Sequence, residues 1–135
     1  GFSTAPADKL YLPVDTATNA PNVASQEADP NSLLNRTRKL IAVKKSEPAL
    51  ANYAEFIPLY AKSNTYPFVY ARANKNDVVI VVLNPSGKEC TATFTVNTPF
   101  KSTKTLAGKN LKLNTNDKQV TVSIPGQSYS IIKLL

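Results

Sequence analysis

Residues 66–87, YPFVYARANKNDVVIVVLNPSG, decide the fold of this chain, because they read as two strands joined by a turn. Pro67–Ala73 is apolar, aromatic and rich in strand-forming residues, and Asn74–Asp77 is a polar turn. Val78–Leu83 is an unbroken apolar run, mostly β-branched, that ends at Asn84–Gly87. Such a run between turn signals is typical of a strand covered on both faces. A buried helix is the alternative, but the run is short for a helix and valine and isoleucine dominate it.

Further strands are predicted on both sides of this hairpin. Tyr53–Ala61 is a candidate strand in which Pro58 marks an edge or a bulge. The downstream candidates, bounded by turn signals, are Thr91–Val96, Thr103–Ala107, Leu111–Leu113, Val120–Ile124 and Ser128–Leu135. Strands that recur every ~8–12 residues predict a mainly β fold, an antiparallel Greek-key sandwich.

The first part of the chain has a different character. Gly1–Ala24 shows no helical or alternating period and contains three prolines, so we expect an extended segment. Val23–Ala28 is predicted to form one helical turn. Asp29 as N-cap and Pro30 at the first helical position predict an amphipathic helix over about residues 30–47, which Pro48 ends.

Charge and hydropathy exclude two classes of partner. The net charge is +7, but the densest basic group lies along the predicted helix without interleaved aromatic residues. We therefore interpret it as a solvated helix face and expect no nucleic-acid partner. No apolar run approaches the roughly 18 residues of a membrane span, and no charged-then-apolar leader is visible, so no membrane association is expected.

The sequence offers no catalytic constellation. Histidine is absent, a single cysteine is present, and the nine carboxylates do not form a motif that pairs two acids. Asp29 is interpreted as a cap, and Asp77 and Asp117 fall in turns. Four widely spaced glycines cannot build a phosphate loop. We therefore predict no catalytic residue, no cofactor and no metal, and by its residues alone the chain is a structural or binding β domain.

Several short motifs nevertheless occur in an order that indicates a known family. They are Gly1–Ser3, Leu12–Val14, Asn22–Gln26, Asp29–Leu50, Tyr66–Tyr70 and Val81–Ser86. Together they resemble the C-terminal end of the α-amylase family, glycoside hydrolase family 13, in its α-glucosidase, oligo-1,6-glucosidase and trehalose synthase branch. The resemblance covers about residues 1–90 and rests on the strand pattern beyond that.

The resemblance implies that catalysis belongs to a domain other than the β-sandwich. In that family a (β/α)8 barrel carries catalysis and an all-β domain follows it. Residues 1–50 would be the tail of the barrel, namely an extended loop and the last helix, and residues 51–135 the C-terminal sandwich that stabilises the barrel. The family's nucleophile, acid–base and third carboxylates would lie upstream. The chain alone is therefore expected to be inactive, while its parent would be a retaining enzyme acting on an α-glucoside or α-glucan.

The same resemblance implies weaker expectations for single residues. Phe2, Asn22 and Gln26 are candidate contacts at the mouth of the substrate cleft, with plain packing against the missing barrel as the alternative. Glu47 stands where the family commonly has a histidine before Pro48-Ala49-Leu50.

The predicted helix presents an apolar face that needs cover. Leu33, Leu34, Leu40 and Ile41 share this face with Thr37. An exposed apolar patch of this kind marks an interface. Besides the missing barrel, the N-terminal segment or a second copy of the chain would cover it, which makes this face a candidate for self-association.

Two other functions stay open at this point. A carbohydrate-binding sandwich would use exposed aromatic rings as a platform, but the chain has no tryptophan. Its candidate rings are Tyr53, Tyr60, Tyr66, Tyr70, Phe100 and Tyr129. An adhesion or scaffold domain would rest on the fold alone.

Overall fold

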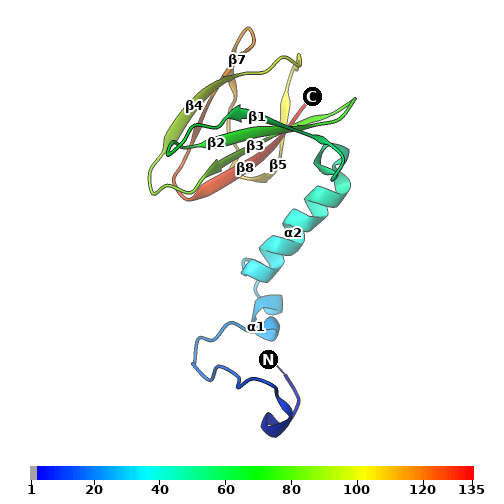
Figure 1. The fold of residues 1–135 in the computed structure, drawn as a ribbon, viewed down its shortest axis with the longest axis vertical. Coiled ribbons are helices and arrows are strands. Elements are labelled where there is room, and N and C mark those ends of the chain that lie inside the picture. The colour runs from blue at the N-terminus through cyan, green and yellow to red at the C-terminus, as the bar shows by residue number, and fades with distance from the viewer. Residues whose placement is uncertain (1–2) are drawn as a thin grey trace. The chain divides into compact units, whose positions relative to one another are not determined.

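The computed structural model describes residues 3–135, which form two compact units (Figure 1). The first unit ends at Ala42 and the second runs from Val43 to Leu135. The division falls inside the long helix. The last turn of that helix therefore belongs to the β unit. The domain boundary after residue 50, which the resemblance implies, stays a prediction.

The first unit contains short helices and extended chain. Its elements are η1 (Ala7–Lys9), α1 (Val23–Ala28) and the first part of α2 (Leu33–Ser46). The α1 turn forms as predicted. Asn22 caps it, because the Asn22 side-chain oxygen accepts a hydrogen bond from the Ser25 amide at 2.9 Å.

The predicted start of α2 at Asp29 and Pro30 is wrong. The helix begins at Leu33, after Ser32, whose hydroxyl oxygen accepts the Asn35 amide at 3.2 Å. That hydroxyl also donates to the Gln26 carbonyl oxygen at 2.6 Å, which anchors the cap. Asp29 instead accepts the Asn31 amide at 2.8 Å and shapes the turn before the cap. The helix ends at Ser46, before Pro48, as expected.

The second unit is an antiparallel β-sandwich, as predicted. A short helix, η2 (Pro48–Leu50), precedes it. Its strands are β1 (Glu55–Tyr60), β2 (Phe68–Ala73), β3 (Val78–Asn84), β4 (Cys90–Thr95), β5 (Thr103–Gly108), β6 (Asn114–Asn116), β7 (Gln119–Ile124) and β8 (Ser128–Leu134). One sheet has the order β1-β2-β3-β8-β5 and the other β4-β7-β6, with every pairing antiparallel (Figure 1). The last strand, β8, thus lies between β3 and β5.

Strand β3 is covered on both faces, as its apolar run predicts. Ile80 and Val82 point between the sheets into the main core, which Phe94, Val122 and others complete from the second sheet. Val79 and Val81 point the other way and pack in a second cluster with Ala49 of η2. Burying a valine or isoleucine side chain contributes about 1.5–3 kcal/mol to folding stability, so β3 stabilises both the main core and the cluster with η2.

One polar residue is buried at the end of this strand. Asn84 is 1% exposed, and its side-chain nitrogen donates to the carbonyl oxygens of Ile124 and Pro125 at 3.1 and 3.0 Å. Its oxygen accepts the Ser86 hydroxyl at 2.6 Å. The residue that the sequence marks as a strand stop therefore joins β3 to the end of β7 across the sandwich.

The strand predicted at Leu111–Leu113 is wrong. Leu111 and Leu113 are half-buried and pack on the main core from a loop, and the strand begins directly after them at Asn114. The pairing of β6 with β7 is set by the tight turn that follows Asn116. Asp117 takes a positive φ of 55° in this turn, a conformation that aspartate tolerates better than most residues.

Candidate functional site

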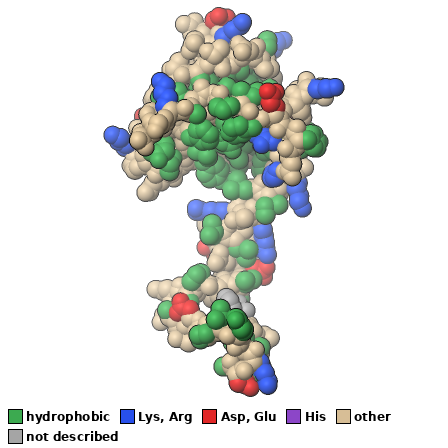
Figure 2. Space-filling view, viewed as in Figure 1, with side chains coloured by type: hydrophobic (Ala, Val, Ile, Leu, Met, Phe, Trp, Pro, Cys, Tyr) green, Lys and Arg blue, Asp and Glu red, His purple; other side chains and the backbone are tan. Residues whose placement is uncertain are grey.

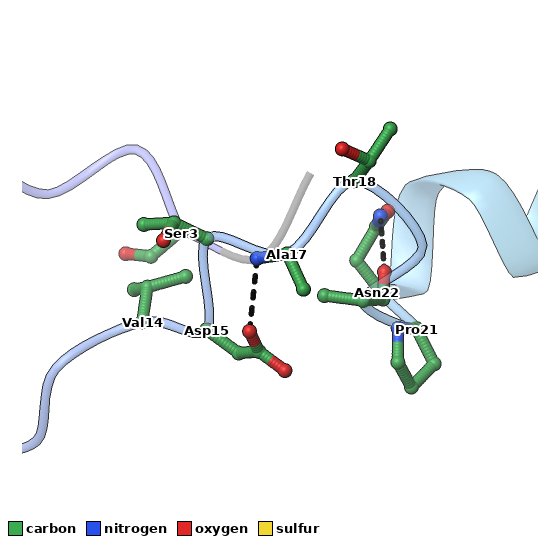
Figure 3. Close-up of a pocket in the computed structure, with 9 residues that line it drawn as sticks. Ser3, Val14, Asp15, Ala17, Thr18, Pro21 and Asn22 are labelled. Atoms are coloured by element: carbon green, nitrogen blue, oxygen red, sulfur yellow. Dashed lines mark hydrogen bonds between the residues drawn. The ribbon is translucent and has the colours of Figure 1, made fainter.

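A pocket of about 390 Å³ lies in the first unit (Figure 3). Ser3, Val14–Thr18, Ala20, Pro21 and Asn22 line it. Hydroxyl, carboxylate and amide groups make it polar, which suits a hydroxyl-rich ligand. Asp15 is the only carboxylate among the described residues that line it, and Asp15 accepts the Ala17 amide at 2.9 Å. Glycoside hydrolysis needs two such groups, so this pocket alone cannot carry it.

The candidate cleft residues have separate places in this unit. Asn22 lines the pocket, but its side-chain oxygen accepts the Ser25 amide at 2.9 Å. Its side-chain nitrogen donates to the Ala20 carbonyl oxygen at 3.4 Å, the bond drawn in Figure 3. The Gln26 side-chain oxygen accepts the Leu34 amide at 3.0 Å, which satisfies a free donor at the start of α2. Phe2 lies outside the described residues. The local roles of Asn22 and Gln26 in this structure are those of helix caps.

The β unit carries a second candidate, an apolar surface on the five-stranded sheet. We call it the outer sheet face, the face turned away from the second sheet. Its apolar members are Phe56, Phe68, Tyr70, Val79, Val81, Leu83, Leu106 and Ile131. Figure 2 shows hydrophobic side chains gathered over this sheet. Helix η2 covers only part of the face, through Ala49 and Leu50.

Three aromatic rings form one end of the outer sheet face. The Tyr70 ring centroid lies 4.9 Å from that of Phe56 and 5.4 Å from that of Phe68. Phe56 remains 49% exposed. Burial raises the pKa of the Tyr70 phenol, and the nearby Arg72 guanidinium partly offsets that rise. An exposed group of large rings on a sheet face is typical of an interface.

The other end of the outer sheet face is polar and tightly paired. Lys133 of β8 lies 2.9 Å from Glu47 and 2.9 Å from Asp77. Hydrogen bonds to these two carboxylates raise the pKa of Lys133. Arg72 donates to the carbonyl oxygens of Ala51 and Ala54, at 2.6 and 2.9 Å. These contacts hold the chain after α2 against the sheet.

Sequence reasoning found single aromatic candidates but missed how they group. Tyr70 joins the ring group, and Tyr129 lies beside Leu83 in the register of the same face. Tyr53 and Tyr66 are exposed, Tyr60 faces the main core, and Phe100 lines a separate pocket. The period of two along β1 and β2 places Phe56, Phe68 and Tyr70 on one face, but only the register between the strands aligns them.

The described residues contain no group of three or more His, Cys, Asp or Glu side chains that could hold a metal ion. Within residues 3–135 no helix is long and apolar enough to cross a membrane.

The sequence matches no protein-family model and no curated protein, but solved structures are similar. An alpha-amylase from H. orenii is 16% identical, with a TM-score of 0.62 over 84% of this chain and 22% of the enzyme. Isomaltulose synthase from Erwinia rhapontici NX5 is 26% identical, with a TM-score of 0.62 over 84% of this chain and 20% of that one. A debranching enzyme from Nostoc punctiforme is 24% identical, with a TM-score of 0.60 over 76% of this chain and 20% of that enzyme.

These neighbours are α-amylase-family enzymes, glycoside hydrolase family 13, and the fold is that of their C-terminal β domain. The chain spans only about a fifth of their length. The likeness therefore concerns one part of each enzyme.

Proposed function

We propose that this chain is the C-terminal part of a retaining glycoside hydrolase of the α-glucosidase branch, and that its β unit is a non-catalytic domain that stabilises the catalytic barrel. The observation that carries the proposal is the outer sheet face, a half-exposed apolar surface on a domain of the matching fold. The parent would act on the α-glucosidic bonds of an α-glucoside or α-glucan.

The energetics of the outer sheet face support a docked barrel. Each large side chain fully removed from water contributes about 1.5–3 kcal/mol, and the half-exposed rings of Phe56, Phe68 and Tyr70 have much of this still to gain. The Lys133 ion pairs and η2 occupy the rest of the face. A barrel packed over the aromatic end would complete its cover.

The apolar face of α2 supports a second contact with the barrel. Leu33 is 75% exposed and Ile41 49% exposed, while Leu34 and Leu40 are half-buried. In the parent this face would pack on the barrel to which α2 belongs. In the isolated chain it would pack on a second copy.

Catalysis in the parent would come from residues upstream of this chain. Retaining hydrolysis uses a nucleophilic carboxylate and an acid–base carboxylate roughly 5–5.5 Å apart. Among the described residues, Asp15 is the single carboxylate that lines the first-unit pocket. Phe2, Asn22 and Gln26 remain proposed contacts at the mouth of the substrate cleft. The first-unit pocket, which Asn22 lines, would accept sugar hydroxyls.

The test compares three proteins encoded by the parent gene. They are the full-length product, the product lacking residues 51–135, and the present chain, each assayed with maltose and with p-nitrophenyl α-glucoside. We expect turnover by the full-length protein, a lower unfolding temperature for the truncated one, and no turnover by the present chain. Turnover by residues 1–135 alone, or a full-length protein inactive on every α-glucoside, would refute the proposal.

A further inference from the structure

A small pocket of about 280 Å³ lies at one end of the sandwich, away from the outer sheet face. Two segments form it, the loop 96–100 after β4 and the hairpin 115–120 that joins β6 to β7. The Val96 amide donates to the Lys118 carbonyl oxygen at 2.9 Å and holds the two walls together. We call this the loop pocket.

The loop pocket combines an apolar floor with a polar rim. Val120 and Val96 are buried in the main core, and the half-buried Phe100 packs against that core from the side. Pro99 and five polar residues complete the lining, the polar ones being Asn97, Thr98, Thr115, Asp117 and Lys118. A flat apolar surface beside several hydrogen-bonding groups is the usual composition of a small-molecule site.

The polar side chains of the rim are unengaged, in contrast to those of the neighbouring strands. On β4 and β7, Thr93 pairs with Thr121 at 2.9 Å, and Gln119 donates to Thr95 at 3.2 Å. Among residues 3–135, the five rim side chains form no hydrogen bond or ion pair with one another or with other side chains. Their donors and acceptors are therefore available to a ligand.

The charge and size of the loop pocket select the class of ligand. Asp117 and Lys118 are its only charged lining residues among those described, and their charges cancel. An anion or a cation is therefore not favoured over a neutral molecule. The volume lies just below the roughly 300–1,000 Å³ of pockets for drug-sized ligands, so a short ligand fits and a long chain does not.

We propose that the loop pocket binds the end of a neutral glucose oligosaccharide, with one sugar ring lying on Phe100 and its hydroxyls held by Asp117, Asn97 and Lys118. Sugar rings offer an apolar C–H face and a rim of vicinal hydroxyls, which match this floor and this rim. The choice of a glucose oligosaccharide rests on the proposed function. The site is distinct from the first-unit pocket and would let the β unit hold substrate independently of catalysis.

The test is a titration of the 135-residue chain with maltotetraose, followed by the amide NMR signals. We expect shifts confined to residues 96–100 and 115–120, with binding in the millimolar range. D117N removes the charge-assisted acceptor, and asparagine tolerates the positive φ at this position, so the fold should be kept. Affinity should fall about tenfold in D117N.

Matched variants separate the site from the rest of the surface. E89Q changes an exposed carboxylate that does not line the loop pocket and should bind like the unmodified chain. F100L keeps an apolar side chain but removes the flat ring, and should weaken binding several-fold. If Phe100 proves essential for folding, D117N still decides the matter.

The proposal would be overturned if no shifts appeared at tens of millimolar sugar, or if the shifts centred on the outer sheet face. Equal affinity of D117N and E89Q would overturn it as well. The titration uses the isolated chain, whereas the proposed function is judged by the activity of the parent. Failure of the loop-pocket proposal and failure of the proposed function can therefore be told apart.

Discussion

Lys133 Nζ lies 2.9 Å from Glu47 Oε2, and this ion pair joins the last strand to the residue after α2 across 86 positions of the chain. Asp77 Oδ1, in the turn before β3, lies 2.9 Å from the same nitrogen. One cation therefore ties three segments together. The carboxylate at position 47, where the resemblance predicts a histidine, is explained by this partner.

Replacing Lys133 should destabilise the β unit. K133M keeps the length and apolar stem but leaves Glu47 and Asp77, both largely enclosed, without their cation. We expect a loss of about 1–2 kcal/mol in the free energy of unfolding, measured by urea denaturation. K104M is the matched control, because Lys104 lies beside Lys133 in the register but is exposed and in no ion pair of the described residues. Equal losses in the two variants would contradict the role of the pair.

The contribution of Lys133 should depend on pH in the alkaline range. Its pKa in the folded state lies above the ordinary value of 10.5, so the folded state holds this proton more tightly than the unfolded state. As far as this proton is concerned, the stabilisation is complete below pH 10.5 and is lost as pH rises through the folded-state pKa. The difference between the unmodified chain and K133M should therefore shrink above that pH.

A charge on the outer sheet face should matter far more in the parent than in the isolated chain. In the isolated chain Phe56 is half exposed, so F56D should cost only its ring contact with Tyr70, about 0.5–1.5 kcal/mol. Against a docked barrel the same aspartate would be buried without a partner. We expect a clearly larger drop in the unfolding temperature of the full-length protein. Tyr53, 86% exposed, supplies the control Y53D, and equal effects of F56D in both proteins would argue against docking here.

Asn84 should be among the most sensitive polar positions. N84A removes the donor to the Ile124 and Pro125 carbonyl oxygens in a site that is 1% exposed. Leaving buried groups unsatisfied costs about 1–3 kcal/mol, which denaturant unfolding will measure. N116A, on the exposed strand β6, should change stability by less than about 0.5 kcal/mol. Equal stability of N84A and the unmodified chain would contradict this role of the amide.

The isolated chain should self-associate through α2. Leu33 and Ile41 are exposed on this helix, so sedimentation velocity should show a mass that rises with protein concentration. The double variant L33K/I41K should remain monomeric. L12K changes a leucine that is 69% exposed outside the helix and should leave association unchanged. A single monomeric species at every concentration would contradict the proposal.

The local elements of the fold could be predicted because their signals are local. The apolar run of β3, the Asn74–Asp77 turn and the Pro48 stop each depend on neighbouring residues only. Local signals do not locate the start of α2, because Asp29 and Ser32 are both good caps and only the contact of Ser32 with Gln26 decides between them. Leu111 and Leu113 have the composition of a strand but pack from a loop.

The candidate sites were harder to predict because they depend on register. Glu47, Asp77 and Lys133 meet only when β3 pairs with β8, and the rings of Phe56 and Tyr70 meet only when β1 pairs with β2. The loop pocket likewise joins two loops that are separate in sequence. Alternation along one strand predicts which face a residue occupies, but not its neighbour across the sheet.

The central place of β8 has a consequence for how this domain comes into being. Until Ser128–Leu134 has left the ribosome, β5 has no partner in its sheet and one side of β3 is bare. The incomplete sheet therefore exposes the unpaired edges of β3 and β5, and unpaired strand edges promote aggregation. Truncation within β8 would remove two strand pairings at once, whereas loss of β1 at the edge of the same sheet would remove only one, so the fold should tolerate the loss of β8 worse.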